Sequence, residues 1–128
     1  DLDTVMPGLT ANDFGDSIRF GASTALEDER DLSKVSCDLH LFDVYAKGFI
    51  EGCGGALTDL EIEMLPMGAI LMTFENGIRV LTDHLEGDHY FHIHREGHNL
   101  DRCRTQLTLV KDMQEKLPQM NEIIRKYK

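Results

Sequence analysis

Hydrophobic residues recur at helical spacing along most of the chain. From residue 100 to residue 117 they return every three or four positions, which predicts an amphipathic helix: Leu100, Cys103, Leu107, Val110, Met113 and Leu117. Pro118 breaks or bends this helix because proline has no amide hydrogen to donate. The pair Ile123-Ile124 then predicts one more short helical segment.

A second helix is predicted over residues 38–51. Its apolar positions fall on one face (Leu41, Phe42, Tyr45 and Phe49), and Gly52 can end it. Thr58 and Glu61 have capping-box spacing and predict the start of a third helix, which continues to about residue 85. Pro66 either lies in an early turn of that helix or kinks it.

The third helix is nearly apolar on all sides over residues 64–74. A helix that is hydrophobic all round is typical of a protein interior. We therefore expect the middle of this helix to be buried.

The amino-terminal part gives weaker signals. Residues 1–12 have the character of a strand end followed by a loop, with a turn at Pro7-Gly8. Asp13 is a good N-cap for a short helix to about residue 25, whose inner side would carry Phe14, Ile18 and Ala22. The charged residues 27–31 predict a solvated loop, and residues 87–99 a second loop. The expected fold is all-α, a single domain with a strand stub at its front.

Composition narrows the classes of partner. The 128 residues suffice for one domain, and the formal net charge of −10 disfavours binding to nucleic acid. The longest uncharged run, residues 64–74, is far shorter than the roughly 20 residues of a membrane-spanning helix. Three widely spaced cysteines (Cys37, Cys53 and Cys103) indicate reduced thiols and a cytoplasmic protein.

Two aspartate motifs near the start are candidate metal ligands. On an extended segment, Asp1 and Asp3 project to the same side and suit Mg²⁺; the alternative is two exposed acids. Asp13-Phe14-Gly15 repeats the triplet that holds magnesium in protein kinases. Because this triplet opens a helix and follows no spare strand, we favour a helix cap over a metal ligand for Asp13.

Five of the six histidines lie within residues 84–98. His92 and His94 have the spacing of two zinc ligands on an extended segment, and Asp83, Asp88 or Glu96 would have to supply a third. Because nothing in the sequence fixes that third ligand, we expect hydrogen-bonded or surface histidines and no zinc.

Residues 94–106 are densely polar and allow two interpretations. They form either a polar wall of a substrate site or the entry into a helix whose charges pair with each other. Gly97 and Asn99 favour the second interpretation, since they suit a turn and a cap.

Taken together, these motifs resemble the aminoglycoside phosphotransferase and homoserine kinase group of small-molecule kinases. The resemblance begins with Asp1-Leu2-Asp3-Thr4, Pro7-Gly8 and residues 13–19 (DFGDSIR). It is closest to N-acetylhexosamine 1-kinases and extends over essentially the whole chain, through residues 25–33, 81–88 and 94–106.

The resemblance implies a role for each early aspartate. Asp1 corresponds to the family's metal-binding aspartate at a strand end, so it would hold Mg²⁺, and Asp3 would add a second contact to metal or substrate. Asp13 corresponds to a later aspartate that caps a helix and braces the catalytic loop.

The resemblance also implies a larger enzyme, called the parent enzyme below. The chain would be the carboxyl-terminal, helical part of a bilobal kinase, a protein-kinase-like C-lobe. The ATP-binding lobe and the catalytic loop with the general base would lie upstream of Asp1. The chain alone is therefore expected to bind no cofactor and to be inactive. We also expect it to self-associate through the apolar wall that the upstream lobe would cover.

For the substrate, the resemblance points to Arg79 and Tyr90 as contacts of the sugar. An ion pair of Arg79 with Asp83, one helical turn later, is the alternative for that arginine. The implied reaction transfers the γ-phosphoryl group of ATP to the anomeric hydroxyl of N-acetylglucosamine or N-acetylgalactosamine.

Three other functions stay open. The same scaffold could take homoserine, choline or an aminoglycoside as its acceptor. A sulfatase acting on mucin sugars would need a Cys-x-Pro-x-Arg motif, which none of the three cysteines provides. A helical interaction module without chemistry is the last alternative.

Overall fold

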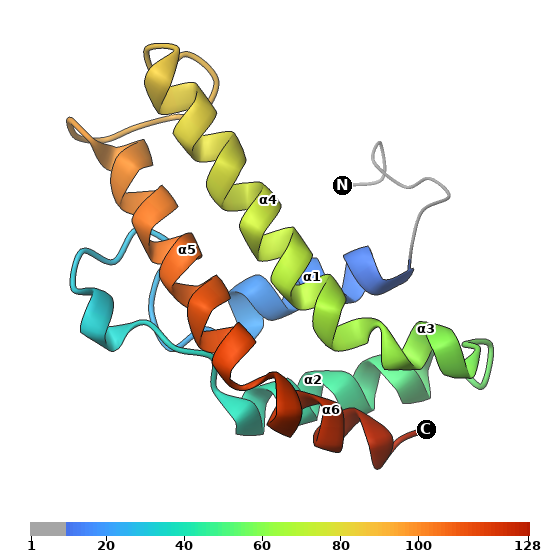
Figure 1. The fold of residues 1–128 in the computed structure, drawn as a ribbon. Coiled ribbons are helices and arrows are strands. Elements are labelled where there is room, and N and C mark those ends of the chain that lie inside the picture. The colour runs from blue at the N-terminus through green and yellow to red at the C-terminus, as the bar shows by residue number, and fades with distance from the viewer. Residues whose placement is uncertain (1–9) are drawn as a thin grey trace.

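The computed structural model describes residues 10–128, and this part of the chain is mostly helical (Figure 1). Its elements are α1 (Thr10–Gly21), the 3-10 helix η2 (Leu32–Lys34), α2 (Leu39–Gly52), α3 (Asp59–Glu63), α4 (Leu65–Leu85), α5 (His98–Glu115) and α6 (Leu117–Arg125). Within residues 10–128 no strand forms, and an isolated antiparallel bridge joins Ser23 to Cys37. The all-α prediction is confirmed for these residues. Most of the segment expected to contain a strand, residues 1–9, lies outside them.

Helix α4 is the central element of the fold. It packs most extensively against α1, which crosses it, and against α5, which runs beside it (Figure 1). Helices α2, α3 and α6 gather around one end of α4, and the loop from α4 to α5 forms the opposite end. The core between these helices is built from apolar side chains of all six, with Phe14, Phe42, Leu65, Leu109, Met113 and Met120 among the fully buried ones.

The predictions for α2 and for the carboxyl-terminal helices are confirmed. The Asp38 carboxylate caps α2 by accepting hydrogen bonds from the amides of His40 (2.9 Å) and Leu41 (3.1 Å). Pro118 lies in the first turn of α6, directly after the end of α5, where its missing amide hydrogen removes no helical hydrogen bond. One member of the predicted inner face of α2, Tyr45, is 41% exposed.

The predicted start of the first helix is wrong by about one turn. Helix α1 begins at Thr10, so the exposed Asp13 lies inside its first turn and is not its N-cap. The extra turn is stabilised from outside, since the Thr10 hydroxyl donates a hydrogen bond to Glu61 (3.1 Å) and Ala11 packs on the core. These long-range contacts are invisible in a local sequence pattern.

The same helix also ends earlier than predicted, at Gly21. The amide of Asp38 donates to the carbonyl oxygen of Ala22 (2.7 Å), and the amide of Thr24 donates to that of Ser36 (2.9 Å). Residues 22–24 therefore pair with an extended segment before α2, and they do not continue the helix.

The long third helix is divided in two. The Thr58–Glu61 capping box starts α3 as predicted, but α3 ends at Glu63 and α4 begins at Leu65. Pro66 lies in the first turn of α4, where helices accept proline. Both alternatives for Pro66 are thus partly realised, since it occupies an early turn at a break.

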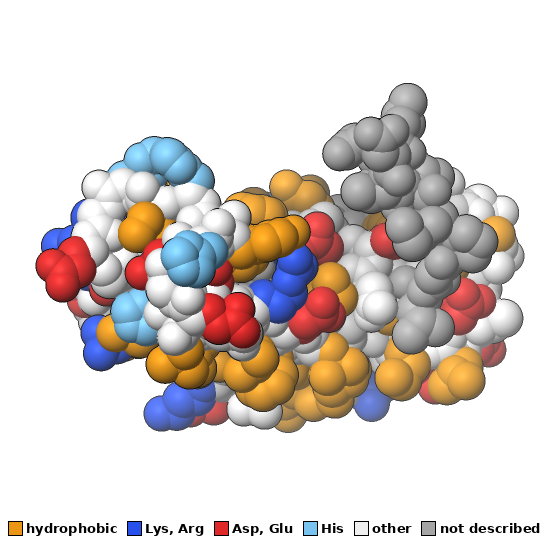
Figure 2. All heavy atoms as spheres, turned by 90° about the horizontal axis from the view of Figure 1, so that it is seen from above, with side chains coloured by type: hydrophobic (Ala, Val, Ile, Leu, Met, Phe, Trp, Pro, Cys, Tyr) orange, Lys and Arg blue, Asp and Glu red, His pale blue; other side chains and the backbone are white. Residues whose placement is uncertain are grey.

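Only one face of α4 is buried, against our expectation for its middle. Leu65, Ala69 and Thr73 are fully buried, whereas Leu71 is 52% and Phe74 is 47% exposed. Four exposed apolar residues of α4 follow four- and three-residue steps, Met67, Leu71, Phe74 and Ile78, and Leu85 is exposed at the end of the helix. Hydrophobic side chains form a row along one side of the molecule in Figure 2. The row is an apolar surface that residues 10–128 do not cover.

Two further findings bear on the class of protein. No helix of the described chain is long and apolar enough to cross a membrane. The three cysteine thiols are free, and burial raises the pKa of Cys37 to about 11, which keeps this thiol protonated at neutral pH.

Candidate functional site

Arg79 and Tyr90 line one pocket, at the end of α4 and the start of the loop that follows it. The pocket has a volume of about 360 Å³, and its other lining residues are Ile78, Thr82, Asp83, Glu86 and Phe91. Both candidate sugar contacts have exposed side chains. The structure therefore brings together the two residues that the resemblance paired.

The wall of the pocket is aromatic and charged. The Tyr90 and Phe91 rings meet edge to face, with centroids 4.9 Å apart and planes at 77°. The guanidinium carbon of Arg79 lies 5.8 Å from the centroid of Phe91, within the range of a cation–π contact. Arg79 is thus held over an apolar ring while its donors stay accessible to a ligand.

The alternative role for Arg79, an ion pair with Asp83, does not occur among the described residues. The Asp83 carboxylate accepts hydrogen bonds from the amides of Tyr90 (2.7 Å) and Phe91 (3.1 Å) and from the side-chain amide of Asn99 (2.7 Å). Burial by itself would raise the pKa of Asp83, but these hydrogen bonds outweigh it and lower the pKa below the usual value. Asp83 is therefore an ionised anchor of the loop, and Arg79 is left to other partners.

The pocket combines groups that suit a polyhydroxylated ligand. Arg79 offers donors in a planar fork, Glu86 offers acceptors, and Tyr90 and Phe91 offer aromatic surface. Hydroxyl groups both donate and accept, so a sugar can satisfy an arginine and a carboxylate at once. Arg79 and Glu86 have opposite charges, and the ionised Asp83 also lines the pocket, so the lining carries more negative than positive charge and favours a neutral ligand over an anion.

The proposed metal ligands cannot be placed in this way. Asp1 and Asp3 lie outside the described residues, so nothing is known of their distance from the pocket. Within residues 10–128, no group of three or more His, Cys, Asp and Glu side chains could hold a metal ion.

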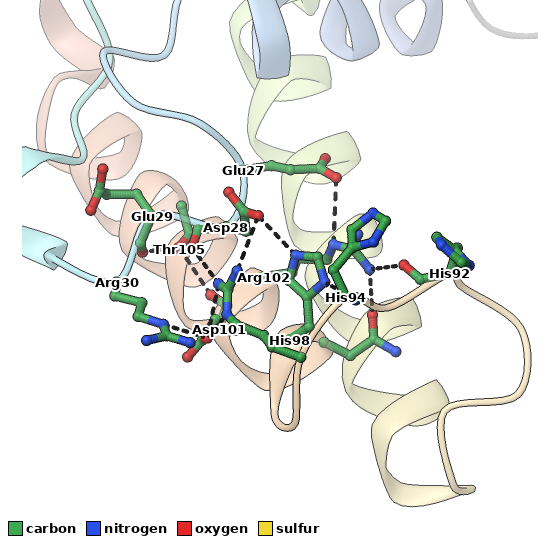
Figure 3. Close-up of polar contacts among 12 residues, drawn as sticks. Glu27, Asp28, Glu29, Arg30, His92, His94, His98, Asp101, Arg102 and Thr105 are labelled. Atoms are coloured by element: carbon green, nitrogen blue, oxygen red, sulfur yellow. Dashed lines mark hydrogen bonds and ion pairs between the residues drawn. The ribbon is translucent and has the colours of Figure 1, made fainter.

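A second polar cluster joins the acidic loop after α1 to the start of α5 (Figure 3). His98 is only 2% exposed, and its Nε2 lies 2.8 Å from an oxygen of Asp28. The amide of His94 donates to Nδ1 of His98 (3.1 Å), so Nε2 must carry the hydrogen that Asp28 accepts. Both ring nitrogens are occupied, which removes His98 as a free base.

Arginines complete this cluster. Arg95 donates from Nε (3.2 Å) and Nη2 (3.0 Å) to one oxygen of Asp101, to which Arg30 also donates (3.2 Å). The Thr105 hydroxyl donates to the carbonyl oxygen of Glu29 (2.6 Å). The prediction of a solvated loop at residues 27–31 is confirmed only in part: none of these residues is buried, but the loop is docked on α5 by paired charges (Figure 3).

The cluster also decides between the two interpretations of residues 94–106. Their charges pair with each other and with the docked loop, as the loop-to-helix interpretation predicts. Gly97 supplies the turn, with a left-handed φ of 72°. Asn99 does not cap α5, however; it lies inside the first turn, and its side chain binds Asp83, Asp88 and Arg102.

Acid is expected to weaken the docking of this loop. The hydrogen bond from His98 lowers the pKa of Asp28, and nearby Arg95 adds to this effect against the opposing effect of burial. A carboxyl group whose pKa is lowered by folding stabilises the protein above its unfolded pKa, near 4, and loses this contribution as the pH falls through the folded value.

The Asp28→Asn variant should therefore be less stable than the wild type near pH 6, and the difference should shrink as the pH falls below the unfolded pKa of aspartate, near 4. Urea midpoints recorded by circular dichroism from pH 7 to pH 2.5 would measure this convergence. A constant difference across the whole range would contradict the role of the Asp28 charge.

The other histidines of residues 84–98 gather at the same end of the molecule (Figure 2). The His92 and His94 rings lie edge to face with centroids 4.5 Å apart, and the His94 ring lies 5.6 Å from that of His98. His98 belongs to the group of five histidines noted in the sequence. Its pairing with Asp28, 70 positions away, could not be predicted from the local sequence pattern.

No known family model matches the chain.

Proposed function

We propose that the chain is the helical, sugar-binding part of an ATP-dependent kinase that phosphorylates the anomeric hydroxyl of an N-acetylhexosamine. The observation that carries this proposal is the shared pocket of Arg79 and Tyr90. Two residues singled out by the resemblance, eleven positions apart, line one hollow of about 360 Å³. Its aromatic and charged lining is of the kind that binds sugars.

The proposal assigns the chemistry to residues outside the described part. Mg²⁺, when bound at Asp1 and Asp3, would neutralise charge on the phosphates of ATP. An aspartate upstream of Asp1 would accept the proton of the sugar hydroxyl. Within the described chain, Arg79 and Tyr90 bind and orient the sugar, and no residue there acts as base or nucleophile.

The test is a phosphoryl-transfer assay with the parent enzyme, expressed with the sequence upstream of Asp1. We expect turnover with N-acetylglucosamine or N-acetylgalactosamine and little with homoserine, choline or an aminoglycoside. Arg79→Ala should raise KM for the sugar about tenfold or more, as expected for a hydrogen bond from a charged group worth roughly 1.5–3 kcal/mol.

Arg104→Ala is the matched control, because Arg104 is an exposed arginine of α5 that does not line the pocket. Equal KM values for the two variants would contradict the assignment of the pocket. Turnover with another acceptor class, sensitive to Arg79, would keep the kinase scaffold and change the substrate.

The exposed row on α4 is the surface that we propose the rest of the parent enzyme covers. Residues 10–128 leave this row uncovered, so we expect concentration-dependent self-association of the chain, measured by sedimentation velocity. Leu71→Glu should abolish it by placing a charge in the row. Val44→Glu, at a 54% exposed position of α2, should not. A wild-type chain that stays monomeric at millimolar concentration would contradict this prediction.

A further inference from the structure

The loop after α4 turns sharply back toward that helix. Gly87 and Asp88 have left-handed backbone conformations, with φ of 102° and 61°. The amide of Asp88 donates to the carbonyl oxygen of Asp83 (2.8 Å), which closes the turn. As a result, Tyr90 and Phe91 return to the side of α4 and become one wall of the pocket.

A single buried carboxylate holds that wall in place. Asp83 is 4% exposed, and its Oδ1 accepts from the Tyr90 amide while its Oδ2 accepts from the Phe91 amide. The two residues whose backbone Asp83 binds are thus the two whose rings line the pocket.

Asn99 ties the same carboxylate to α5. Its side chain is fully buried, and its Nδ2 donates to Asp83 (2.7 Å) and to Asp88 (3.0 Å). Its Oδ1 accepts from Arg102 (2.9 Å), so every polar atom of this side chain has a partner. The pair Asp83–Asn99 therefore joins α4, the returning loop and α5 at one point.

We infer that Asp83 and Asn99 are positioning residues for sugar binding. They do not have to contact the sugar, because they hold Tyr90 and Phe91, whose rings line the pocket. Arg79 stands one helical turn before Asp83 on α4, so the anchor fixes how far this arginine lies from the aromatic wall. This inference rests on the proposed function, because it assigns the purpose of the anchored wall to sugar binding.

The chemistry of the anchor requires an acid at position 83. A carboxylate accepts on both oxygens, whereas an asparagine has one acceptor oxygen and presents an NH₂ group in place of the other. In Asp83→Asn, the NH₂ group would face the Tyr90 amide if it took the place of Oδ1, or both the Phe91 amide and Asn99 Nδ2 if it took the place of Oδ2. The isosteric change thus removes bonds without removing volume.

The experiment uses the 128-residue chain, with N-acetylglucosamine as the probe and Asp112→Asn as the matched control. Asp112 also accepts a backbone hydrogen bond, from the Cys37 amide (2.6 Å), but it does not line the pocket. Hydrogen exchange of the Tyr90 and Phe91 amides reports on the anchor, and NMR titration gives the Kd for the sugar.

We expect Asp83→Asn to speed exchange at both amides and to raise the Kd at least tenfold. Asp112→Asn should lower the melting temperature and leave both quantities unchanged.

Two results would overturn the inference. A Kd unchanged by Asp83→Asn, with exchange either fast or slow, would remove the positioning role and leave the proposed function standing. Failure of the wild-type chain to bind the sugar would overturn the positioning role together with the proposed pocket, whatever the exchange rates show.

Discussion

Replacing Gly15 by alanine is expected to lower the free energy of unfolding by about 3 kcal/mol, at the upper end of overpacking effects. Helices α1 and α4 touch backbone to backbone at this point. A Cβ on Gly15 would lie 2.5 Å from the carbonyl carbon of Gly68 and 2.9 Å from the amide nitrogen of Ala69. Backbone atoms cannot turn aside as a side chain can, so the two helices would have to separate.

Gly48→Ala is the control for this experiment. Gly48 lies inside α2, is exposed, and a Cβ there would meet nothing within 4 Å. Alanine favours helix over glycine by about 0.5–1 kcal/mol, so this variant should be slightly more stable than the wild type. Urea unfolding followed by far-UV circular dichroism measures both changes, and a Gly15→Ala protein as stable as Gly48→Ala would disprove the close contact.

This contact explains the literal Asp-Phe-Gly triplet without a metal. Phe14 is fully buried and meets the rings of Phe42 (5.7 Å) and Phe49 (5.3 Å). Gly15 permits the approach of α4, and Asp13 is exposed in the first turn of α1, where a negative charge favours the helix. Each member of the triplet therefore has a structural reason to stand where it does.

Local signals in the sequence were sufficient for the helices that carry their own caps. The Asp38 cap of α2 and the Thr58 capping box of α3 depend on residues at most three positions apart; the capping box and the start of α2 near residue 38 were both predicted. The first helix was misplaced at both ends because distant partners decide them. Glu61 supports its start, and the segment before α2 takes over the backbone bonds after its end.

The same distinction applies to the candidate site. Arg79 and Tyr90 were identified by resemblance, and the structure adds that they share a pocket. The pairing of Asp28 with His98 and of Glu29 with Thr105 joins residues more than 60 positions apart, so a run of acids gave no sign of its partners. For α4, the sequence showed an apolar helix but not which side would be covered.

Asp1→Asn in the parent enzyme is expected to reduce turnover with ATP and N-acetylhexosamine by orders of magnitude. If Asp1 binds the Mg²⁺ ion as proposed, that ion would neutralise charge on the transferring phosphoryl group and lower the activation free energy by several kcal/mol. Asparagine is nearly the same size as aspartate, so the fold should keep its stability. The loss should be reduced, at least in part, by a higher magnesium concentration.

Asp13→Asn is the informative comparison, since both changes remove one carboxylate charge. Asp13 stands in the first turn of α1, where loss of its charge should cost about 0.3–1 kcal/mol of stability. If it also braces the catalytic loop of the parent enzyme, the rate should fall in part, and added magnesium should not restore it. Rates against magnesium concentration, measured with melting temperatures for both variants, separate the two roles. A nearly silent Asp1→Asn together with an Asp13→Asn enzyme that has lost metal-dependent turnover at unchanged stability would make the Asp-Phe-Gly triplet the metal site and refute the assignment of Asp1.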